Sequence, residues 1–206
     1  MALSIVHNTT VCVVGMGYVG HPLAKAFSRH IRTIGYDLDA NKVAKIAAEP
    51  QNEIIVTTDP KMIHLADFVI VAVPTPVTMS KDPDTSYIVS AAETIGQNIK
   101  DGAIVVLEST VYPGLTEELL IPTLERASGK TCGKGFFVGY SPERINPGDK
   151  VNSLQKVMKV TSGSTAEAGL VVDALYKKII HAGTHLAPSI KVAEAAKVIE
   201  NAQRDV

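Results

Sequence analysis

The chain has 206 residues, of which 46% are hydrophobic and 20% are charged. These proportions are typical of a folded globular protein and exclude a disordered or collagen-like chain. The 20 Lys and Arg residues and the 21 Asp and Glu residues leave a formal net charge of −1, so there is no overall positive field that would bind nucleic acid or an anionic membrane. The longest uninterrupted apolar run, 68–74, is far shorter than the roughly 20 residues that cross a bilayer.

The N-terminus and the cysteines indicate the compartment. Residues 1–10 have neither the basic start nor the long apolar segment of a secretory signal. The two cysteines, Cys12 and Cys132, lack the paired spacing of a zinc site or a disulfide framework. We therefore expect a cytoplasmic protein with two free thiols and no metal site.

Short β-branched runs alternate with segments of helical period, which predicts parallel strands joined by crossover helices. In the first half of the chain we expect strands at 10–15, 32–37, 54–57 and 68–73. Helices are expected at 18–29, 42–48 and 86–98, with Asp39 as the cap of the second and a helical turn after Asp59. The strand at 68–73 is apolar on both faces, as is typical of a central parallel strand.

The second half continues the alternation. Strands are expected at 103–107, 136–140 and 156–161, with a short extended piece near His185, and helices after 113–114, at 164–178 and from 189 to the end. The pattern predicts an α/β protein with a doubly wound, mostly parallel, Rossmann-type sheet. The last helix has no C-capping glycine or proline, so we expect the chain to stop inside a truncated long helix. We divide it into a Rossmann-type domain, 1–187, and the start of that helix, 188–206.

Residues 15–20 read Gly-Met-Gly-Tyr-Val-Gly, the G-x-G-x-x-G pattern, between the first predicted strand and the first predicted helix. Gly15 permits the tight turn, Gly17 lets the backbone approach a pyrophosphate, and Gly20 lets the helix pack on the strand. The helix N-terminus offers N–H groups to the phosphates, so Tyr18 and Val19 belong to the predicted cofactor site. The alternative is a glycine-rich turn that serves chain geometry alone.

Asp37 strengthens the prediction of a dinucleotide site. It ends the second predicted strand 17 positions after Gly20, close to the roughly 20 expected for the acid that binds the adenosine ribose. Its carboxylate would repel a 2′-phosphate, which favours NAD over NADP. The alternative, capping of the next helix, is assigned to Asp39. Lys42 either reaches the adenosine or is a solvated surface lysine.

Three polar loops follow predicted strands, at the edge where doubly wound sheets bind ligands. In 73–76, Pro74 and Pro76 stiffen the backbone around Thr75. The loop 108–114 places hydroxyls before a helix, where they either cap it or hold a water or a nicotinamide group. The loop 140–149 carries an acid, a base and an amide between prolines, which suits a polar ligand. For 73–76 the alternative is a turn that leaves the sheet.

The last helix presents Ile190, Glu194, Lys197 and Asn201 along one stripe. If the stripe faces the sheet, Lys197 could stabilise an oxyanion or act as a base, and Asn201 could position a group or a water. The alternative, which the spacing alone favours, is a solvated Glu–Lys pair on an exposed face.

Together these motifs resemble the UDP-glucose/GDP-mannose dehydrogenase family, most closely its bacterial members that act on UDP-N-acetylglucosamine or UDP-N-acetylgalactosamine. The resemblance covers almost the whole chain and is carried by 15–20, 73–76, 109–111, 141–149 and 191–201. It implies oxidation of a sugar C6 alcohol to a carboxylate with NAD, through an aldehyde and a cysteine-bound thioester, for surface polysaccharide synthesis.

The resemblance also implies roles for individual residues. Those implied to contact NAD are Gly15, Gly17, Tyr18, Val19, Gly20, Asp37, Lys42, Pro74, Thr75 and Thr110. The implied catalytic residues are Glu143 for thioester hydrolysis and active-site water, Lys197 and Asn201 for the oxyanion, and Thr110. Arg144 and Asn146 are implied to meet the substrate.

The family's nucleophilic cysteine lies further downstream, in a nucleotide-sugar-binding domain, and neither Cys12 nor Cys132 stands at its place. The resemblance therefore implies the NAD-binding half of a dehydrogenase that is inactive alone, with a UDP-sugar as substrate and a homodimer in the full-length protein. Two alternatives stay open. One is a β-hydroxyacid dehydrogenase that uses Lys197 and Asn201, and the other is a non-catalytic NAD-sensing module.

Overall fold

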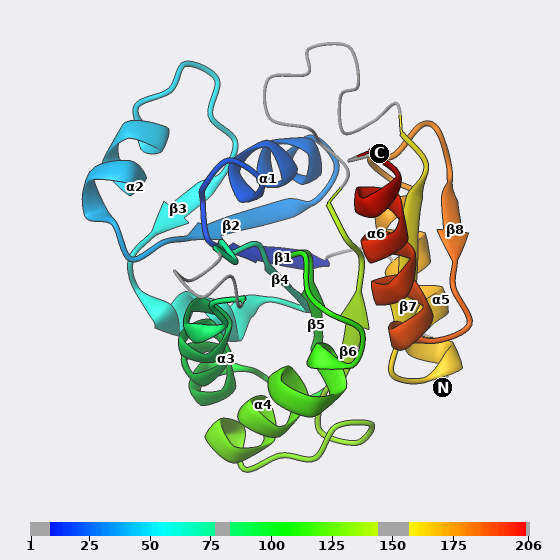
Figure 1. Cartoon of the computed structure of the whole chain (residues 1–206). Helices are drawn as coiled ribbons and strands as arrows, with labels where there is room; N and C mark the ends of the chain where they lie inside the picture. Colours follow the sequence, from blue (N-terminus) through cyan, green and yellow to red (C-terminus); the bar gives the residue numbers. More distant parts are fainter. Residues whose placement is uncertain (1–8, 77–82, 144–156, 205–206) are drawn as a thin grey trace.

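The computed structural model describes residues 9–76, 83–143 and 157–204. In these residues eight strands form one sheet (Figure 1): β1 (Thr10–Val14), β2 (Arg32–Tyr36), β3 (Ile55–Thr57), β4 (Phe68–Val71), β5 (Ile104–Leu107), β6 (Phe137–Tyr140), β7 (Lys159–Gly163) and β8 (Thr184–Leu186). Their order is β3-β2-β1-β4-β5-β6-β7-β8. All neighbours are parallel except β6 and β7. The strand order reverses between β1 and β4, which confirms the predicted doubly wound, mostly parallel sheet.

Helices and helical turns connect the strands: α1 (Gly20–Ser28), α2 (Ala40–Ala47), the 3-10 turn η1 (Pro60–Leu65), α3 (Ser86–Asn98), the π-helical turn η2 (Thr116–Leu120), α4 (Ile121–Ser128) and α5 (Ala166–Tyr176). A further helix, α6 (Ile190–Arg204), follows the last strand. The predicted cap of α2 is confirmed, because the Asp39 carboxylate accepts hydrogen bonds from the backbone N–H groups of Asn41 and Lys42. β7 begins later than predicted and ends later, since Gly163 still pairs with Gly139 of β6.

Each face of the sheet is covered by helices, as the apolar strands require. Alternate residues of a strand point to opposite faces, so Val11 and Val13 of β1 pack on one side with α1 and α5. Cys12 and Val14 pack on the other side with α3, α4 and the start of α6 (Figure 1). Cys12 is fully buried, and burial raises the pKa of its thiol to about 12, which makes it an inert core residue.

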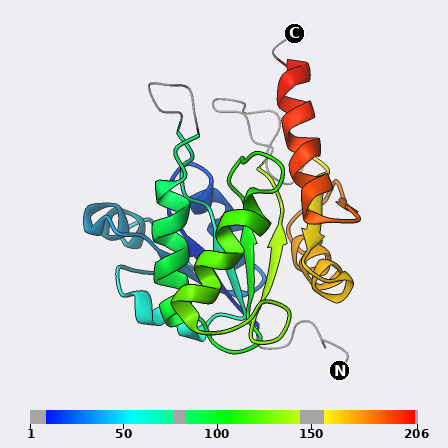
Figure 2. The same ribbon diagram turned by 60° about the horizontal axis from the view of Figure 1, so that its bottom comes forward.

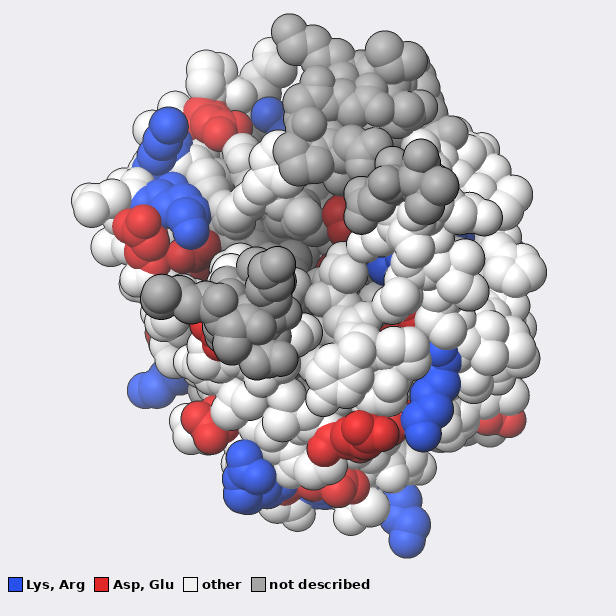
Figure 3. Space-filling model, viewed as in Figure 1, with Lys and Arg blue, Asp and Glu red and all other residues white. Residues whose placement is uncertain are grey.

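α6 starts inside the core and runs beyond it. Ile190 and Ala193, in its first turn, are buried with the residues of α3 and α4, and the helix then extends past the carboxyl ends of the strands (Figure 2). The division of the chain at 187/188 stays a prediction. No helix in the described ranges is long and apolar enough to cross a membrane. Basic and acidic side chains are interspersed over the described part of the face in Figure 3.

Candidate functional site

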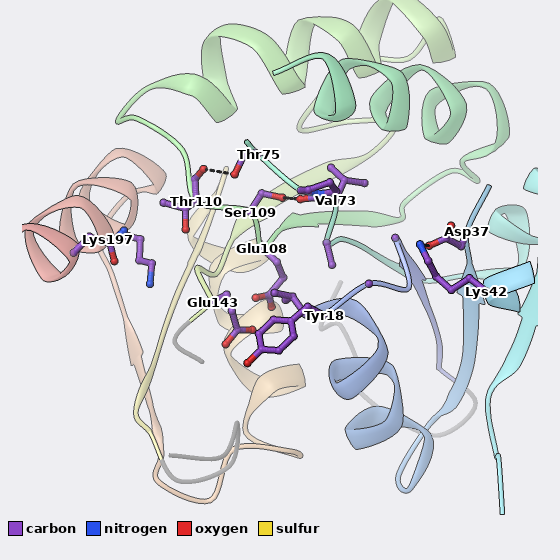
Figure 4. A pocket seen from close by; sticks show the side chains of 16 residues that line it. Tyr18, Asp37, Lys42, Val73, Thr75, Glu108, Ser109, Thr110, Glu143 and Lys197 are labelled. Atoms are coloured by element: carbon purple, nitrogen blue, oxygen red, sulfur yellow. Dashed lines mark hydrogen bonds and ion pairs between the residues drawn. The ribbon is translucent and has the colours of Figure 1, made fainter. Parts of the chain in front are cut away.

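A cavity of about 490 Å³ lies at the carboxyl ends of the central strands (Figure 4). It is lined by Gly15, Gly17, Tyr18, Val19, Asp37, Lys42, Ala72, Val73, Pro74, Thr75, Glu108, Ser109, Thr110, Glu143, Lys197 and Asn201. The structure thus brings together the described residues that the sequence assigned to the cofactor and to catalysis, apart from Gly20, which is buried and does not line the cavity. Arg144 and Asn146 lie outside the described residues.

The glycine turn fits a dinucleotide pyrophosphate. Gly15 has a φ of +93°, which L side chains rarely adopt. A Cβ on Gly20 would lie 1.8 Å from the carbonyl oxygen of Gly15, whereas a Cβ on Gly17 would meet no atom within 4 Å. Gly17 lines the cavity, and Val19, the N-cap residue of α1, makes no capping hydrogen bond with its side chain. The turn therefore leaves open space where a phosphate would approach the helix N-terminus.

The Asp37 carboxylate is held in place by three donors. Its Oδ2 accepts from the backbone N–H of Met16 and from Lys42 Nζ, both at 2.8 Å, and its Oδ1 accepts from the Asp39 N–H at 3.0 Å. Burial alone would raise the pKa of this carboxyl, but the hydrogen bonds from Lys42, Asp39 and Met16 outweigh burial and lower it. Asp37 is therefore ionised at neutral pH. Lys42 is paired with it although its side chain is 38% exposed, and its contact with the adenosine stays a prediction.

Two loops after β4 and β5 are tied together and form one wall of the cavity (Figure 4). The Thr75 hydroxyl donates to the carbonyl oxygen of Thr110 at 3.0 Å, and the Ser109 hydroxyl donates to the carbonyl oxygen of Val73 at 2.6 Å. The loop 73–76 is thus more than a turn that leaves the sheet. The Thr75 hydroxyl holds the main chain of Thr110, and this bond fixes the distance between the two loops.

The stripe predicted on α6 faces the sheet and the cavity. Lys197 is 6% exposed and points into the cavity (Figure 4), which Asn201 also lines. Its Nζ lies 3.7 Å from Glu200 Oε2. Glu194 is fully buried and accepts hydrogen bonds from the N–H groups of Gly114 and Thr116 and from the Thr116 hydroxyl, at 2.6, 3.0 and 2.6 Å. The alternative prediction, a solvated Glu194–Lys197 pair on an exposed face, is therefore wrong, because both residues are buried and this face of α6 lies against the sheet.

A buried ionic cluster around Glu108, at the wall of the cavity, was missed by the sequence analysis. Glu108, at the end of β5, is fully buried, and its carboxylate accepts from Lys159 Nζ of β7 at 2.9 Å and from the Tyr176 hydroxyl of α5. Burial raises the pKa of the Glu108 carboxyl to about 7. The Lys159 ammonium lowers this pKa in part, and the nearby Glu143 raises it further. The one available signal was an acid directly after an apolar strand, the same placement as Asp37.

The fold and this cavity define a dinucleotide-binding protein of the Rossmann class. The chain belongs to the UDP-glucose/GDP-mannose dehydrogenase family, because the model of the family's NAD binding domain matches residues 47–180. NAD is therefore the cofactor of this domain, and the glycine turn, the ionised Asp37 and the open space at Gly17 fit it.

Relatives and solved structures agree with the family. The chain is 49% identical to the UDP-N-acetyl-D-glucosamine 6-dehydrogenase of Pseudomonas aeruginosa, over 95% of this chain and 50% of that protein. It is 47% identical to Protein CapL of Staphylococcus aureus, over 97% and 50%. The structure of a UDP-D-ManNAc dehydrogenase from Pyrococcus horikoshii superposes with a TM-score of 0.87 at 29% identity, covering 96% of this chain and 51% of that one. The chain thus spans about half the length of these proteins.

Proposed function

We propose that the chain is the NAD-binding half of a nucleotide-sugar 6-dehydrogenase, which oxidises the C6 alcohol of a UDP-N-acetylhexosamine to the uronic acid for surface polysaccharide synthesis. The observation that carries the proposal is a single cavity that joins the glycine turn to Glu143, Lys197 and Asn201. The substrate class rests on the identity to two bacterial UDP-N-acetyl-D-glucosamine 6-dehydrogenases, 49% and 44%. The link to surface polysaccharide is carried over from the family resemblance of the sequence motifs.

Binding follows from the order of residues along the cavity (Figure 4). Gly17 and the N-terminus of α1 take the pyrophosphate, and Asp37 takes the hydroxyls of the adenosine ribose. The nicotinamide end then lies toward Thr110, Glu143 and Lys197, on the other side of the glycine turn from Asp37. NAD supplies the hydride acceptor.

Two side chains, Lys197 and Glu143, would carry out the chemistry at the nicotinamide end of the cavity. The Lys197 ammonium, nearly excluded from water, stabilises the negative charge that develops on the substrate oxygen, with Asn201 orienting the same group. The Glu143 carboxylate, 8% exposed, holds a water or exchanges a proton with it. Arg144 and Asn146 stay predicted substrate contacts.

A covalent thioester step needs a reactive thiolate, and the two cysteines do not offer one to the cavity. Cys12 is buried in β1 with the pKa of its thiol raised to about 12, and burial also raises the pKa of Cys132. Neither residue lines the cavity. We infer that the thiolate comes from residues outside this chain, so the chain binds NAD and does not turn over UDP-sugar alone. In the full-length protein a homodimer is expected.

The proposal is tested by calorimetry with NAD and then with UDP-N-acetylglucosamine, followed by an assay for NADH. We expect heat from NAD, little from the sugar nucleotide, and no steady NADH until the nucleotide-sugar-binding half of a relative is supplied. Lys197→Met is the matched variant, expected to bind NAD and to stay inactive in the supplemented assay. Absence of NAD binding would contradict the cofactor assignment, and steady NADH from the chain alone would contradict its incompleteness.

A further inference from the structure

Lys159 holds the peptide that precedes Glu143. Lys159 is 2% exposed, and its ammonium donates to the carbonyl oxygens of Ser141 and Pro142, at 3.3 and 3.0 Å, and to Glu108 Oε2 at 2.9 Å. An ammonium has three N–H donors and no acceptor. These three contacts therefore use its full donor capacity, and two of them hold the chain immediately before Glu143.

Glu108 holds the same peptide from the other side. Its backbone carbonyl accepts from the N–H of Glu143 at 3.2 Å, while its side chain faces Lys159 and the Tyr176 hydroxyl. Lys159 Nζ also lies 5.0 Å from the centre of the Tyr176 ring. The side chains of Glu108, directly after β5, of Lys159 in β7 and of Tyr176 in α5 thus converge behind one short segment, 141–143. The last side chain of this segment, Glu143, enters the cavity (Figure 4).

A buried ion pair is a costly way to stabilise a core, since apolar residues of similar volume often do as well or better. Here the charge does what an apolar group cannot do, because only a donor holds two adjacent carbonyl oxygens in fixed directions. Glu108 Oε2 accepts one hydrogen bond of the ammonium, and the Tyr176 hydroxyl satisfies the second carboxylate oxygen. The cluster of Glu108, Lys159 and Tyr176 therefore surrounds and holds the peptide before Glu143, in addition to filling the core.

We propose that Lys159 is a positioning residue that fixes Glu143 at the nicotinamide end of the cavity, with Glu108 and Tyr176 as its counter-groups. The proposal rests on the proposed function for the role of Glu143, but the positioning itself is a property of this chain. It predicts that loss of the cluster loosens 141–143 selectively, while the sheet stays intact.

Amide hydrogen exchange followed by NMR on the 206-residue chain tests this. The variant is the double substitution Glu108→Gln/Lys159→Met, which leaves no unpaired buried charge. We expect the exchange rate of the Glu143 amide to rise about tenfold more than the rates of the β5 amides. The reason is that the carbonyl oxygens of Ser141 and Pro142 lose their charged donor, so the segment 141–143 opens more often. The single variant Lys159→Met should show the same local rise together with a larger global loss of stability.

The matched control is Thr161→Val. Thr161 stands two residues further along β7, and its buried hydroxyl donates to Asp173 Oδ1 at 2.9 Å, away from the segment 141–143. This variant also loses a buried hydrogen bond, so exchange should rise evenly at Glu143 and in β5. Equal effects in the double variant and in the control would overturn the positioning role.

NAD separates this proposal from the proposed function. In the wild-type chain and in Thr161→Val, NAD should shift the Glu143 amide resonance, and in the double variant the shift should be smaller. If NAD shifts no resonance around the cavity in any variant, the proposed function fails, while the exchange result still decides the positioning role. If NAD binds but the Glu143 amide of the double variant exchanges and shifts as in the control, Lys159 is a structural residue only.

Discussion

Gly17 and Gly20 belong to the same turn, yet their surroundings differ. A methyl group on Gly17 would enter the open space of the cavity, where the pyrophosphate is expected. We predict that Gly17→Ala weakens NAD binding at least about tenfold, while the free energy of unfolding changes by less than about 1 kcal/mol. Calorimetry with NAD and urea denaturation measure the two effects.

Gly20→Ala is the control for that substitution. Its Cβ would lie 1.8 Å from the Gly15 carbonyl oxygen, so the backbone must shift, at a cost of about 1–3 kcal/mol in stability. A Gly17→Ala chain that binds NAD like the wild type would show that the pyrophosphate does not approach this turn.

The Asp37–Lys42 pair is expected to set the choice between NAD and NADP. Replacing Asp37 by serine removes the charge that repels a 2′-phosphate, and it releases the Lys42 ammonium, now 2.8 Å from the carboxylate. We predict that Asp37→Ser raises the affinity for NADP relative to NAD by about tenfold or more, a change of about 1.4 kcal/mol. Titration of both dinucleotides gives the ratio.

The double variant Asp37→Ser/Lys42→Met should lose most of this gain, because no cation is left to meet the phosphate. If the ratio of affinities is the same in the wild type and in Asp37→Ser, the carboxylate does not select against the 2′-phosphate.

Residues in local motifs could be predicted from the sequence, and residues that meet through the fold could not. Gly15, Gly17 and Asp37 follow strands directly, so their place at the sheet edge comes from the strand itself. Lys159 meets Glu108 across 51 positions of sequence, and Tyr176 meets it across 68. Lys159 and Tyr176 look ordinary in their own elements, and only the strand order brings them to Glu108.

At the scale of the element, α6 shows what a helical pattern leaves open. The spacing placed Glu194, Lys197 and Asn201 on one stripe, which is consistent with the structure, but it did not tell what the stripe faces. Glu194 binds the turn at Gly114 and Thr116, and this contact fixes α6 so that Lys197 reaches the cavity. A pattern identifies a face of a helix, and the partner of that face depends on the rest of the sheet.

We predict that Glu194→Gln lowers the free energy of unfolding by about 2–3 kcal/mol, because a charged acceptor of three hydrogen bonds becomes a neutral amide with only one oxygen. Urea denaturation measures the loss. Lys191→Met is the control on the same helix, since Lys191 Nζ forms an exposed pair with Glu117 Oε2 at 3.3 Å, and its removal should change stability by less than about 1 kcal/mol. Equal losses in the two variants would mean that Glu194 does not fasten the helix.

At the scale of the whole molecule, the alternation of strands and helices was enough to predict the sheet. Parallel neighbours need a crossover, and each predicted crossover helix in the first half is present. The direction of β7 could not be predicted in this way. It follows a Pro- and Gly-rich segment with no predicted helix, and a connection of that kind permits either direction. In the structure β7 is antiparallel to β6.

The buried Glu108 should give the stability of the whole chain a dependence on pH. The pKa of Glu108 is raised from 4.5 to about 7 in the folded protein, so between these values the folded state holds a proton that the unfolded state has released. Its favourable contribution is complete below pH 4.5 and is lost as the pH rises through about 7. The lowered pKa values of Asp37 and Asp173 act below this window, where their contributions are lost as the pH falls.

We therefore predict that the wild type loses on the order of 3 kcal/mol relative to Glu108→Gln as the pH rises across this window. The glutamine keeps the neutral form at every pH, so its own curve lacks this decline and serves as the reference. Urea denaturation of both chains in steps from pH 5 to pH 8 measures the difference. Parallel curves would mean that Glu108 is ionised in the folded state throughout, and the Lys159 ammonium would then outweigh the burial of the carboxylate.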